Sequence, residues 1–475
     1  MHLTIPAAIA AALLLSSCAL GDREEPQTGE SWLAGDHHIH SRYSVGYDRE
    51  NLPNYTIGGD AIYPTPMNAL MARTFGLSWI VTTDHGGPNH SKINFDKAYP
   101  ELQQSRAALP DVIQFYGMEL NTPAADHSSL IIPFTVDERE RLMELESSFD
   151  KYEPWPPEPE RDREQTMITA LKTMAGLKEK PVVIANHPSR SATGPGAYGL
   201  DEPRELRGWN DAAPNVAVGM AGAPGHQAAT LSERKVARGA YREFPTMGGF
   251  DQMTARLGGF WDSMLGEGRR WWITANSDSH VHHTEGGIDF WPGEYSKTYV
   301  YAEKSHAAIL SSLRDGRIFV TTGDLVSELY VEVMGESESA EIGGSLTLPG
   351  TAEVSVRIRL RDPDVPNHNG DNPRVKRVDL IVGDVTGPVA DKTVDSNDST
   401  RVLKRFTVDD WHADGEYLSM THVVPIKGPS YIRVRGTNTD EAEPEQDAND
   451  EDPWQDLWFY SNPVFIDMAP WPQRN

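Results

Sequence analysis

Residues 65–87 read TPMNALMARTFGLSWIVTTDHGG, and this stretch decides the predicted fold. The apolar run at residues 77–83 is typical of a buried strand, and residues 65–75 before it suit a helix. Asp84 and His85 follow at the point where that strand should end. The stretch therefore combines a helix, a buried strand and a polar cluster at the strand end.

The same alternation of helical and apolar segments continues from Trp32 to about Thr322. Further strands are expected at residues 112–118, 129–134, 181–185 and 271–275, and further helices at residues 163–177, 250–265 and 305–315. This pattern is typical of βα units around a parallel sheet, either closed or open.

Two insertions interrupt the alternation. Residues 153–160 (EPWPPEPE) predict a loop stiffened by proline, and residues 189–247 are rich in Gly, Ala and Pro without a clear period. Long loops often carry function, so the second insertion is a candidate wall of a substrate pocket. The alternative is a surface elaboration without contact to a substrate.

The pattern changes after Gly323 to short alternating strands separated by Gly, Pro and Asp. They are expected at residues 329–333, 352–360, 375–382, 402–406, 431–435 and 458–466. Such strands predict an all-β sandwich of general immunoglobulin-like type at residues 326–475. The acidic residues 440–452 (DEAEPEQDANDED) predict a solvated loop, with calcium binding as the alternative.

The chain begins with an apolar stretch that suits a signal peptide over residues 1–20. It ends in Leu15-Ser16-Ser17-Cys18, which resembles the lipobox of a bacterial lipoprotein, and Cys18 is the only cysteine. We expect lipid on Cys18 and a polar tether at residues 21–31. An ordinary secreted protein and a merely apolar N-terminus are the alternatives.

The net charge of −27 limits the kinds of partner that this protein is expected to bind. Nucleic acids and anionic membrane surfaces would both be repelled, so neither is expected as a partner. A solubilising surface charge is the simplest explanation of the acidic balance. No second apolar run approaches the length of a bilayer.

Histidines and carboxylates cluster where the predicted strands end. The clusters are Asp36-His37-His38-Ile39-His40, Thr83-Asp84-His85, Gly117-Met118-Glu119 with His127 shortly after, Asn186-His187-Pro188, and Ser277-Asp278-Ser279-His280. On a strand, residues two apart face the same side, so His38 and His40 can reach one ion while His37 points away. A single histidine is more often a satisfied polar group. Several coinciding clusters, however, would carry a large desolvation penalty without metal ions.

Taken in order, these clusters resemble the successive motifs of the PHP domain, the polymerase and histidinol phosphatase superfamily. The resemblance covers about residues 33–319 and implies a distorted seven-stranded βα barrel, here assigned to residues 32–325. It also implies two or three divalent metal ions, Zn, Mn or Fe, at the carboxyl ends of the strands. The fold prediction is thus an α/β barrel followed by a β-sandwich.

The resemblance further implies which residues bind each ion. The first ion would be bound by His38, His40, Glu119 and Asp278. Glu119 would bridge to a second ion, which His127 and His187 would also bind. A third ion would be bound by His85, His280 and one more ligand. Where related chains usually place that ligand, this sequence has Val45 and Gly46. Asp60 is the favoured replacement, with Asp48 as the alternative.

Clustered divalent ions lower the pKa of a bridging water, so that hydroxide is available near neutral pH. The same ions stabilise the charge that grows on a phosphate ester during in-line displacement. His280, or His85 if it binds no metal, is a candidate general acid. Arg42 and Arg190 are candidate phosphate ligands, with an ordinary surface role as the alternative.

The remaining polar residues near the motifs have less specific interpretations. Asp84 is expected to orient a neighbouring ligand. His226 lies in the long insertion and either lines the pocket or has no special role. His90, His282 and His283 are expected outside the metal ligands. Residues 291–295 (WPGEY) either form an aromatic pocket wall or cover the edge of the core.

The leading hypothesis is a metal-dependent phosphoesterase that acts on a small-molecule phosphate ester. It would be anchored through Cys18 in a bacterial cell envelope, on its periplasmic or outer face. A second hypothesis keeps the hydrolase but changes the bond to an amide or lactone. A third is a non-enzymatic surface protein whose β-sandwich binds a glycan or a partner protein.

Overall fold

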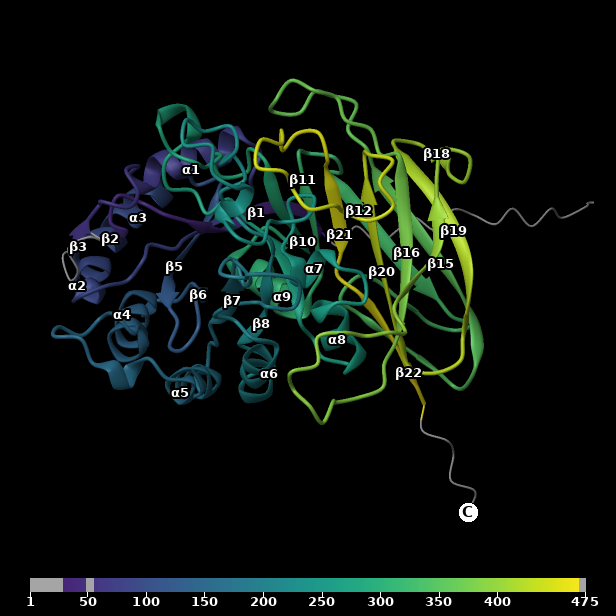
Figure 1. Cartoon of the computed structure of the whole chain (residues 1–475), viewed down its shortest axis with the longest axis horizontal. Helices are drawn as coiled ribbons and strands as arrows, with labels where there is room; N and C mark the ends of the chain where they lie inside the picture. Colours follow the sequence, from purple (N-terminus) through teal and green to yellow (C-terminus); the bar gives the residue numbers. More distant parts are fainter. Residues whose placement is uncertain (1–28, 48–54, 470–475) are drawn as a thin grey trace, which may run out of the picture.

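The structure is a computed structural model that describes residues 29–47 and 55–469. Figure 1 shows helices and strands of the N-terminal part on the left and the strands of the C-terminal part on the right. The expected signal peptide with Cys18, most of the expected tether, and Asp48 lie outside the described residues. Within the described ranges, no helix combines the length and apolar character needed to cross a bilayer.

The N-terminal part alternates strands and helices. Its strands are β1 (Ser31–Ile39), β2 (Val45–Tyr47), β3 (Tyr55–Ile57), β4 (Trp79–Thr82), β5 (Ile113–Asn121), β6 (His127–Ile132), β7 (Val182–Asn186), β8 (Ala217–Ala223), β9 (Trp272–Ala275), β10 (Ser296–Ala302) and β11 (Ile318–Thr322). Its α-helices are α1 (Thr65–Thr74), α2 (His90–Ile93), α3 (Tyr99–Ala108), α4 (Glu138–Phe149), α5 (Glu164–Ala175), α6 (Pro203–Ala212), α7 (Gln252–Ala255), α8 (Phe260–Gly266) and α9 (His306–Asp315).

The expected helix at residues 305–315 forms as α9, and its ends follow local chemistry. The Ser305 side chain accepts a hydrogen bond from the Ala308 N–H and so caps the first turn. Gly316 ends the helix in the left-handed conformation, with φ of 72°. The prediction of one continuous helix at residues 250–265 is wrong. Two short helices, α7 and α8, form instead, separated by Gly258 with φ of 71°.

One mixed sheet runs through most of the molecule, in the order β14-β22-β20-β21-β11-β10-β1-β4-β5-β6-β7-β8-β9. Strands β1, β4 and β5 run parallel, as do β7, β8 and β9. The expected parallel sheet is therefore found only in part: β6 is antiparallel to both neighbours, and β10 is antiparallel to β1 and β11. A short connection of residues 122–126 joins β5 to β6, and such a connection permits only a hairpin.

Strand β8 lies inside the segment that looked like an insertion, and α6 precedes it. Its sequence, AVGMAGA, is mostly Ala and Gly and has a single β-branched residue, Val218, so it carries little of the signal that marks a strand. The small residues are needed because β8 packs very closely against β9: a Cβ at Gly219 would lie 2.1 Å from the backbone oxygen of Trp272. Residues 189–247 thus contribute a regular helix and strand to the sheet as well as loops.

The two ends of this N-terminal strand series approach each other. The Ala275 N–H in β9 donates to Thr298 Oγ1 in β10, at 2.8 Å. Asn462 bridges the same region, donating from its backbone N–H to Ile318 and from its side chain to Ile273. Among the described strands, no backbone ladder joins β9 to β10 or β11. The described fold is mixed α/β with a large, strongly curved sheet.

Beyond Gly323 the described part of the chain contains strands and no helix. They are β12 (Glu328–Met334), β13 (Ser339–Ala340), β14 (Ser345–Leu348), β15 (Ala352–Arg361), β16 (Arg377–Asp384), β17 (Arg401–Phe406), β18 (His412–Asp414), β19 (Tyr417–Ile426), β20 (Ser430–Thr437), β21 (Trp458–Ser461) and β22 (Val464–Met468). Five of them form a second sheet, β13-β12-β15-β19-β18, while β21 continues the large sheet through β11.

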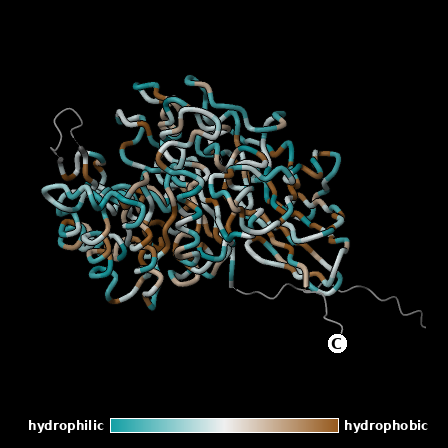
Figure 2. The backbone as a smooth tube through the Cα atoms, turned by 60° about the horizontal axis from the view of Figure 1, so that its bottom comes forward, coloured by the Kyte–Doolittle hydropathy of each residue, from teal (hydrophilic) through white to brown (hydrophobic). Residues whose placement is uncertain are grey.

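The apolar core is continuous between the two parts of the chain. Trp458, Tyr460 and Phe465 from the C-terminal strands belong to the same buried cluster as Trp272 of β9. Figure 2 shows hydrophobic segments through the interior of both parts and hydrophilic segments mostly toward the outside. Burial of this shared apolar surface holds the C-terminal strands against the strands that carry the histidine clusters.

Candidate metal centre

The predicted ligands come from strand ends that meet at one edge of the large sheet. His38 lies in β1 and His40 just beyond it, while His85 follows β4 and His187 follows β7. Parallel strands place their carboxyl ends at the same edge. The β5–β6 hairpin adds His127 there, because it pairs with Asn121 near the end of β5.

Glu119 lies at the centre of the cluster. Its Oε1 atom is 3.0 Å from His38 Nε2, 3.3 Å from His127 Nδ1 and 3.2 Å from His187 Nε2. Its Oε2 atom is 3.0 Å from His85 Nδ1. The Asn186 side chain donates a further hydrogen bond to Oε1, at 2.9 Å. One fully buried carboxylate thus faces histidines from four different segments.

Asp278 forms a second focus beside Glu119. Its Oδ1 atom lies 3.1 Å from both His38 Nε2 and His40 Nε2. Its Oδ2 atom lies 2.8 Å from His226 Nε2. Because the two carboxylates share His38 and His40, their ligand atoms surround a common space.

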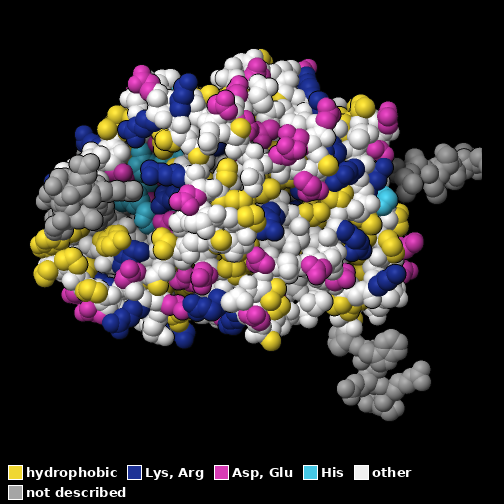
Figure 3. Space-filling view, in the orientation of Figure 1, with side chains coloured by type: hydrophobic (Ala, Val, Ile, Leu, Met, Phe, Trp, Pro, Cys, Tyr) yellow, Lys and Arg dark blue, Asp and Glu magenta, His cyan; other side chains and the backbone are white. Residues whose placement is uncertain are grey.

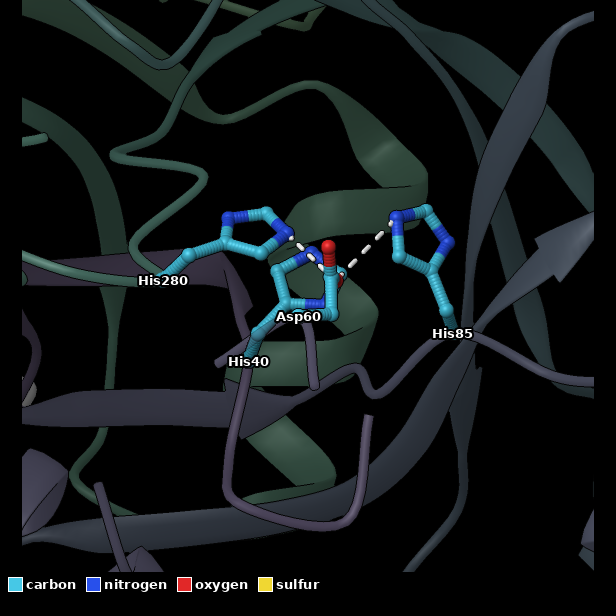
Figure 4. Close-up of side chains that lie close together, drawn as sticks. All are labelled: His40, Asp60, His85 and His280. Atoms are coloured by element: carbon cyan, nitrogen blue, oxygen red, sulfur yellow. Dashed lines mark ion pairs between the residues drawn. The ribbon is translucent and has the colours of Figure 1, made fainter. Parts of the chain in front are cut away.

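Asp60 lies at the edge of the cluster nearest to solvent. Figure 4 shows it between His280 and His85, with His40 beside them. Its Oδ2 atom is 2.9 Å from His280 Nε2 and 3.7 Å from His85 Nε2. Burial alone would raise the pKa of Asp60, but the neighbouring His280 lowers it below its ordinary value. Asp60 is therefore placed where the predicted third set needs a ligand.

Several sets of candidate ligand atoms lie within 4.8 Å of one another. They include His38, His40, Glu119 and Asp278; His85, Glu119 and His127; His40, Asp60, His85 and His280; and His226, Asp278 and His280. The first set has the same members as the predicted first ion. The other sets differ from the predicted ones. His85 lies with Glu119 and His127 of the predicted second ion, and His40 lies with Asp60, His85 and His280 of the predicted third ion. His187 contacts Glu119 and lies 3.9 Å from Asp278.

The donor set fits divalent metal ions. His38 Nε2 and His40 Nε2 lie 3.0 Å apart, and they cannot both direct a proton at each other. Glu119 Oε2 is buried and accepts no hydrogen bond from the described residues, although His85 Nδ1 lies 3.0 Å away. Unsatisfied buried polar atoms are costly, and a cation among these atoms would satisfy them. Imidazole and carboxylate are preferred ligands of Zn, Mn and Fe.

Electrostatics keep two of the imidazoles, those of His40 and His187, in the form that binds metal, whereas neighbouring carboxylates raise the pKa of His38 and His280 against the effect of burial. Burial, reinforced by His280, lowers the pKa of His40 to about 4. Burial, reinforced by Arg190, lowers the pKa of His187 to about 4 as well. Both rings are therefore neutral near pH 7, with a lone pair available. Burial alone would raise the pKa of Glu119, but the surrounding histidines hold it well below its ordinary value.

Neighbouring polar residues hold the ligands in place. Asp84 accepts hydrogen bonds from the Ser41 N–H at 2.5 Å and the Ser41 hydroxyl at 2.7 Å. It thereby fixes the backbone next to His40, which agrees with its expected orienting role. Ser44 Oγ lies 3.0 Å from His40 Nδ1 and donates to Asp60, also at 3.0 Å. His37 points away from the cluster, toward Ser129 and Thr274.

The two arginines predicted near the site differ in their placement. Arg190 lines the cavity above the cluster and donates to Asp126 at 2.8 Å. Arg42 instead donates to Glu101, with half of its side chain exposed, and is not among the residues that line this cavity. The structure therefore brings Arg190, but not Arg42, to the candidate centre.

His226 lines the cavity, which was one of the two roles considered for it, and Asp289, which the sequence pattern did not indicate, lies beside it. Burial would lower the pKa of His226, but Asp278 and Asp289 raise it to about 10. As a cation near neutral pH, His226 holds the Asp278 carboxylate by a charge-assisted hydrogen bond. His226 follows β8 closely, so recognition of that strand would have placed it at a strand end like the other ligands.

A cavity of about 600 Å³ opens above the cluster. Asp60, His85, His127, Asp278 and His280 contribute to its lining, together with His226 and Asp289. Ser191, Thr193, Arg234, Arg242 and Glu243 add polar groups from residues 189–247. Figure 3 shows recessed histidine side chains on this face, with Lys or Arg side chains beside them. Part of the predicted insertion thus lines the cavity over the candidate metal centre.

No family model and no curated protein matches the sequence. Among solved structures, a match is a two-domain protein from Bacteroides vulgatus that contains a predicted PHP-like metal-dependent phosphoesterase. It has 13% sequence identity and a TM-score of 0.36, and the match covers 88% of this chain and 94% of that chain.

Proposed function

We propose that this protein is a metal-dependent phosphoesterase that uses two or three divalent ions, Zn, Mn or Fe. The observation that carries the proposal is the convergence of imidazole and carboxylate atoms on Glu119 and Asp278, beneath a cavity with arginine on its wall. Bound divalent ions would supply Lewis acidity and an activated water at this position. The buried cluster of histidines and carboxylates supports metal binding in general, and the arginines among the cavity-lining residues favour a phosphate ester.

The protein's own groups have separate roles in this proposal. Arg190, fixed by Asp126, would bind phosphate oxygens through charge-assisted hydrogen bonds. His85 and His280 both line the cavity, and whichever of them holds no ion would protonate the leaving oxygen. His226 and Asn186 would hold the carboxylates of Asp278 and Glu119 in place.

We further propose that residues 32–325 form a distorted seven-stranded barrel of PHP type, followed by an immunoglobulin-like sandwich at residues 326–475. The order of the sequence motifs supports this assignment. The hydrogen bonds that link β9 directly to β10, and through Asn462 to β11, also support it, because they draw the ends of the strand series together.

The function is tested by elemental analysis of the purified protein combined with a substrate panel. The panel contains phosphomonoesters, phosphodiesters, amides and lactones, each assayed with and without a chelator. We expect bound Zn, Mn or Fe and a chelator-sensitive release of phosphate. Hydrolysis confined to amides or lactones would favour the second hypothesis. Protein without bound metal and without activity on any ester would contradict the proposal.

We also propose that Cys18 carries lipid and anchors the protein in a bacterial cell envelope. The proposal is supported by the apolar run before Cys18 and by the polar residues after it. In a bacterial host, Cys18→Ala should move the protein from the membrane fraction to the soluble fraction. Retention of the variant in the membrane fraction would reject the anchor.

A further inference from the structure

Two arginines on the cavity wall are not explained by the metal centre. Arg234 and Arg242 lie in the loop between β8 and α7, are exposed, and line the cavity. No carboxylate in the described ranges forms an ion pair with either guanidinium. We call these two residues the arginine wall.

Arg234 and Arg242 place two positive charges on the cavity lining of a chain whose net charge is −27. Nearby arginines of the same segment are paired: Arg190 with Asp126 at 2.8 Å, and Arg238 with Asp456 at 2.9 Å. The arginine wall instead faces a cavity that a ligand can enter. A guanidinium presents planar, paired donors that match the oxygens of a phosphate or carboxylate.

Hydrogen bonds to carboxylates of the C-terminal part hold the segment that carries the arginine wall in place. Arg238, between the two arginines in sequence, is fully buried and donates to Asp456 and, at 3.1 Å, to Glu451. Asp447 accepts hydrogen bonds from Thr246, at 2.5 Å, and from the Gly249 N–H, at 3.1 Å.

These carboxylates belong to residues 440–456, which we call the acidic loop. The solvated state predicted for residues 440–452 is wrong at Asp447, which is buried because it satisfies polar groups of the other part. The contacts limit the motion of the segment that bears the arginine wall, and a preorganised cation binds an anion at a smaller entropic cost.

We propose that the arginine wall is a second anion subsite, so that the substrate is a phosphate ester with a further phosphate or carboxylate group. This inference rests on the proposed function, because the reacting phosphate would occupy the metal centre. The second anionic group would bind Arg234 and Arg242, and Ser191 and Thr193 offer hydroxyl donors on the same cavity lining.

The test compares glycerol monophosphate with glycerol bisphosphate and phosphoglycerate, which share one short carbon skeleton. We expect wild-type protein to prefer at least one of the doubly anionic esters by kcat/KM. Preference for the bisphosphate or for phosphoglycerate distinguishes a phosphate from a carboxylate as the second group. Arg234→Gln and Arg242→Gln should each reduce that preference by about tenfold, since each removes a charged hydrogen bond.

Arg357→Gln is the matched control. It removes the same charge from an exposed arginine of β15 that pairs with Glu332, away from the cavity lining. It should leave the preference unchanged. An equal preference in wild type and in the Arg234→Gln/Arg242→Gln double variant would overturn the subsite, as would a wild type that does not discriminate between the esters.

If wild-type protein hydrolyses none of these esters, the proposed function fails and calorimetric binding of glycerol bisphosphate decides the subsite separately. Binding at least about tenfold weaker in the double variant than in wild type would support the arginine wall as an anion site. Equal binding by both proteins, or no binding by wild type, would overturn it.

Discussion

Replacement of Glu119 by Gln should remove bound metal and lower phosphate-ester hydrolysis by at least about a thousandfold, because bound metal contributes several kcal/mol to transition-state stabilisation. Glu119 faces His38, His127 and His187 through one oxygen and His85 through the other. The amide keeps the size of the side chain but removes the charge that ions would share. Elemental analysis and initial rates measure the two effects.

Glu144→Gln provides the control for Glu119→Gln. Glu144 lies on the surface of α4, where it pairs with the nearby Arg141. The variant should keep the metal content and rate of wild type, since surface ion pairs contribute little. Full metal content and unchanged turnover in the Glu119→Gln protein would refute the central position of this carboxylate.

Replacement of Arg433 by Met should lower the free energy of unfolding by about 3–5 kcal/mol, because it leaves a buried carboxylate without its counter-charge. Arg433 of β20 donates two hydrogen bonds to Asp262 of α8, at 2.8 Å and 2.7 Å. Both side chains are about 1% exposed, and Tyr431 also donates to Asp262. This pair joins the helical part to the C-terminal strands. Urea unfolding followed by tryptophan fluorescence measures the loss.

Two further variants separate charge from packing at this pair. Arg433→Met/Asp262→Asn removes both charges and should recover at least half of the lost stability, because no charge stays buried alone. Arg357→Met changes an exposed arginine that pairs with Glu332, and should cost less than about 1 kcal/mol. A double variant no more stable than Arg433→Met would show that packing, rather than the unpaired charge, causes the loss.

Much of the candidate centre could be predicted because its chemistry lies in short local patterns. The spacing of His38 and His40 puts both rings on one side of a strand. In the structure both rings contact the carboxylates of Asp278 and Glu119. Asp60 followed from the family pattern rather than from a strand end. The structure places it next to His280 and His85.

The parts that could not be predicted depend on contacts between distant segments. Strand β8 is built from small residues because β9 packs closely against it, so its own sequence carries little strand signal. His226 consequently looked like a loop residue. Arg42 looked like a phosphate ligand because it follows His40 closely in the sequence. Its side chain instead pairs with Glu101, which is distant in sequence, and does not line the cavity.

The sequence alone determined the residue types of the centre, the alternation of strands and helices, and the change to β-structure after Gly323. These features follow from periodicity and side-chain chemistry, which are local properties. The tertiary structure alone decided that β6 runs antiparallel and that His226 holds Asp278. It also decided that the acidic loop binds the segment of the arginine wall. Burial and charge pairing across long sequence separations set these features, and no local pattern encodes them.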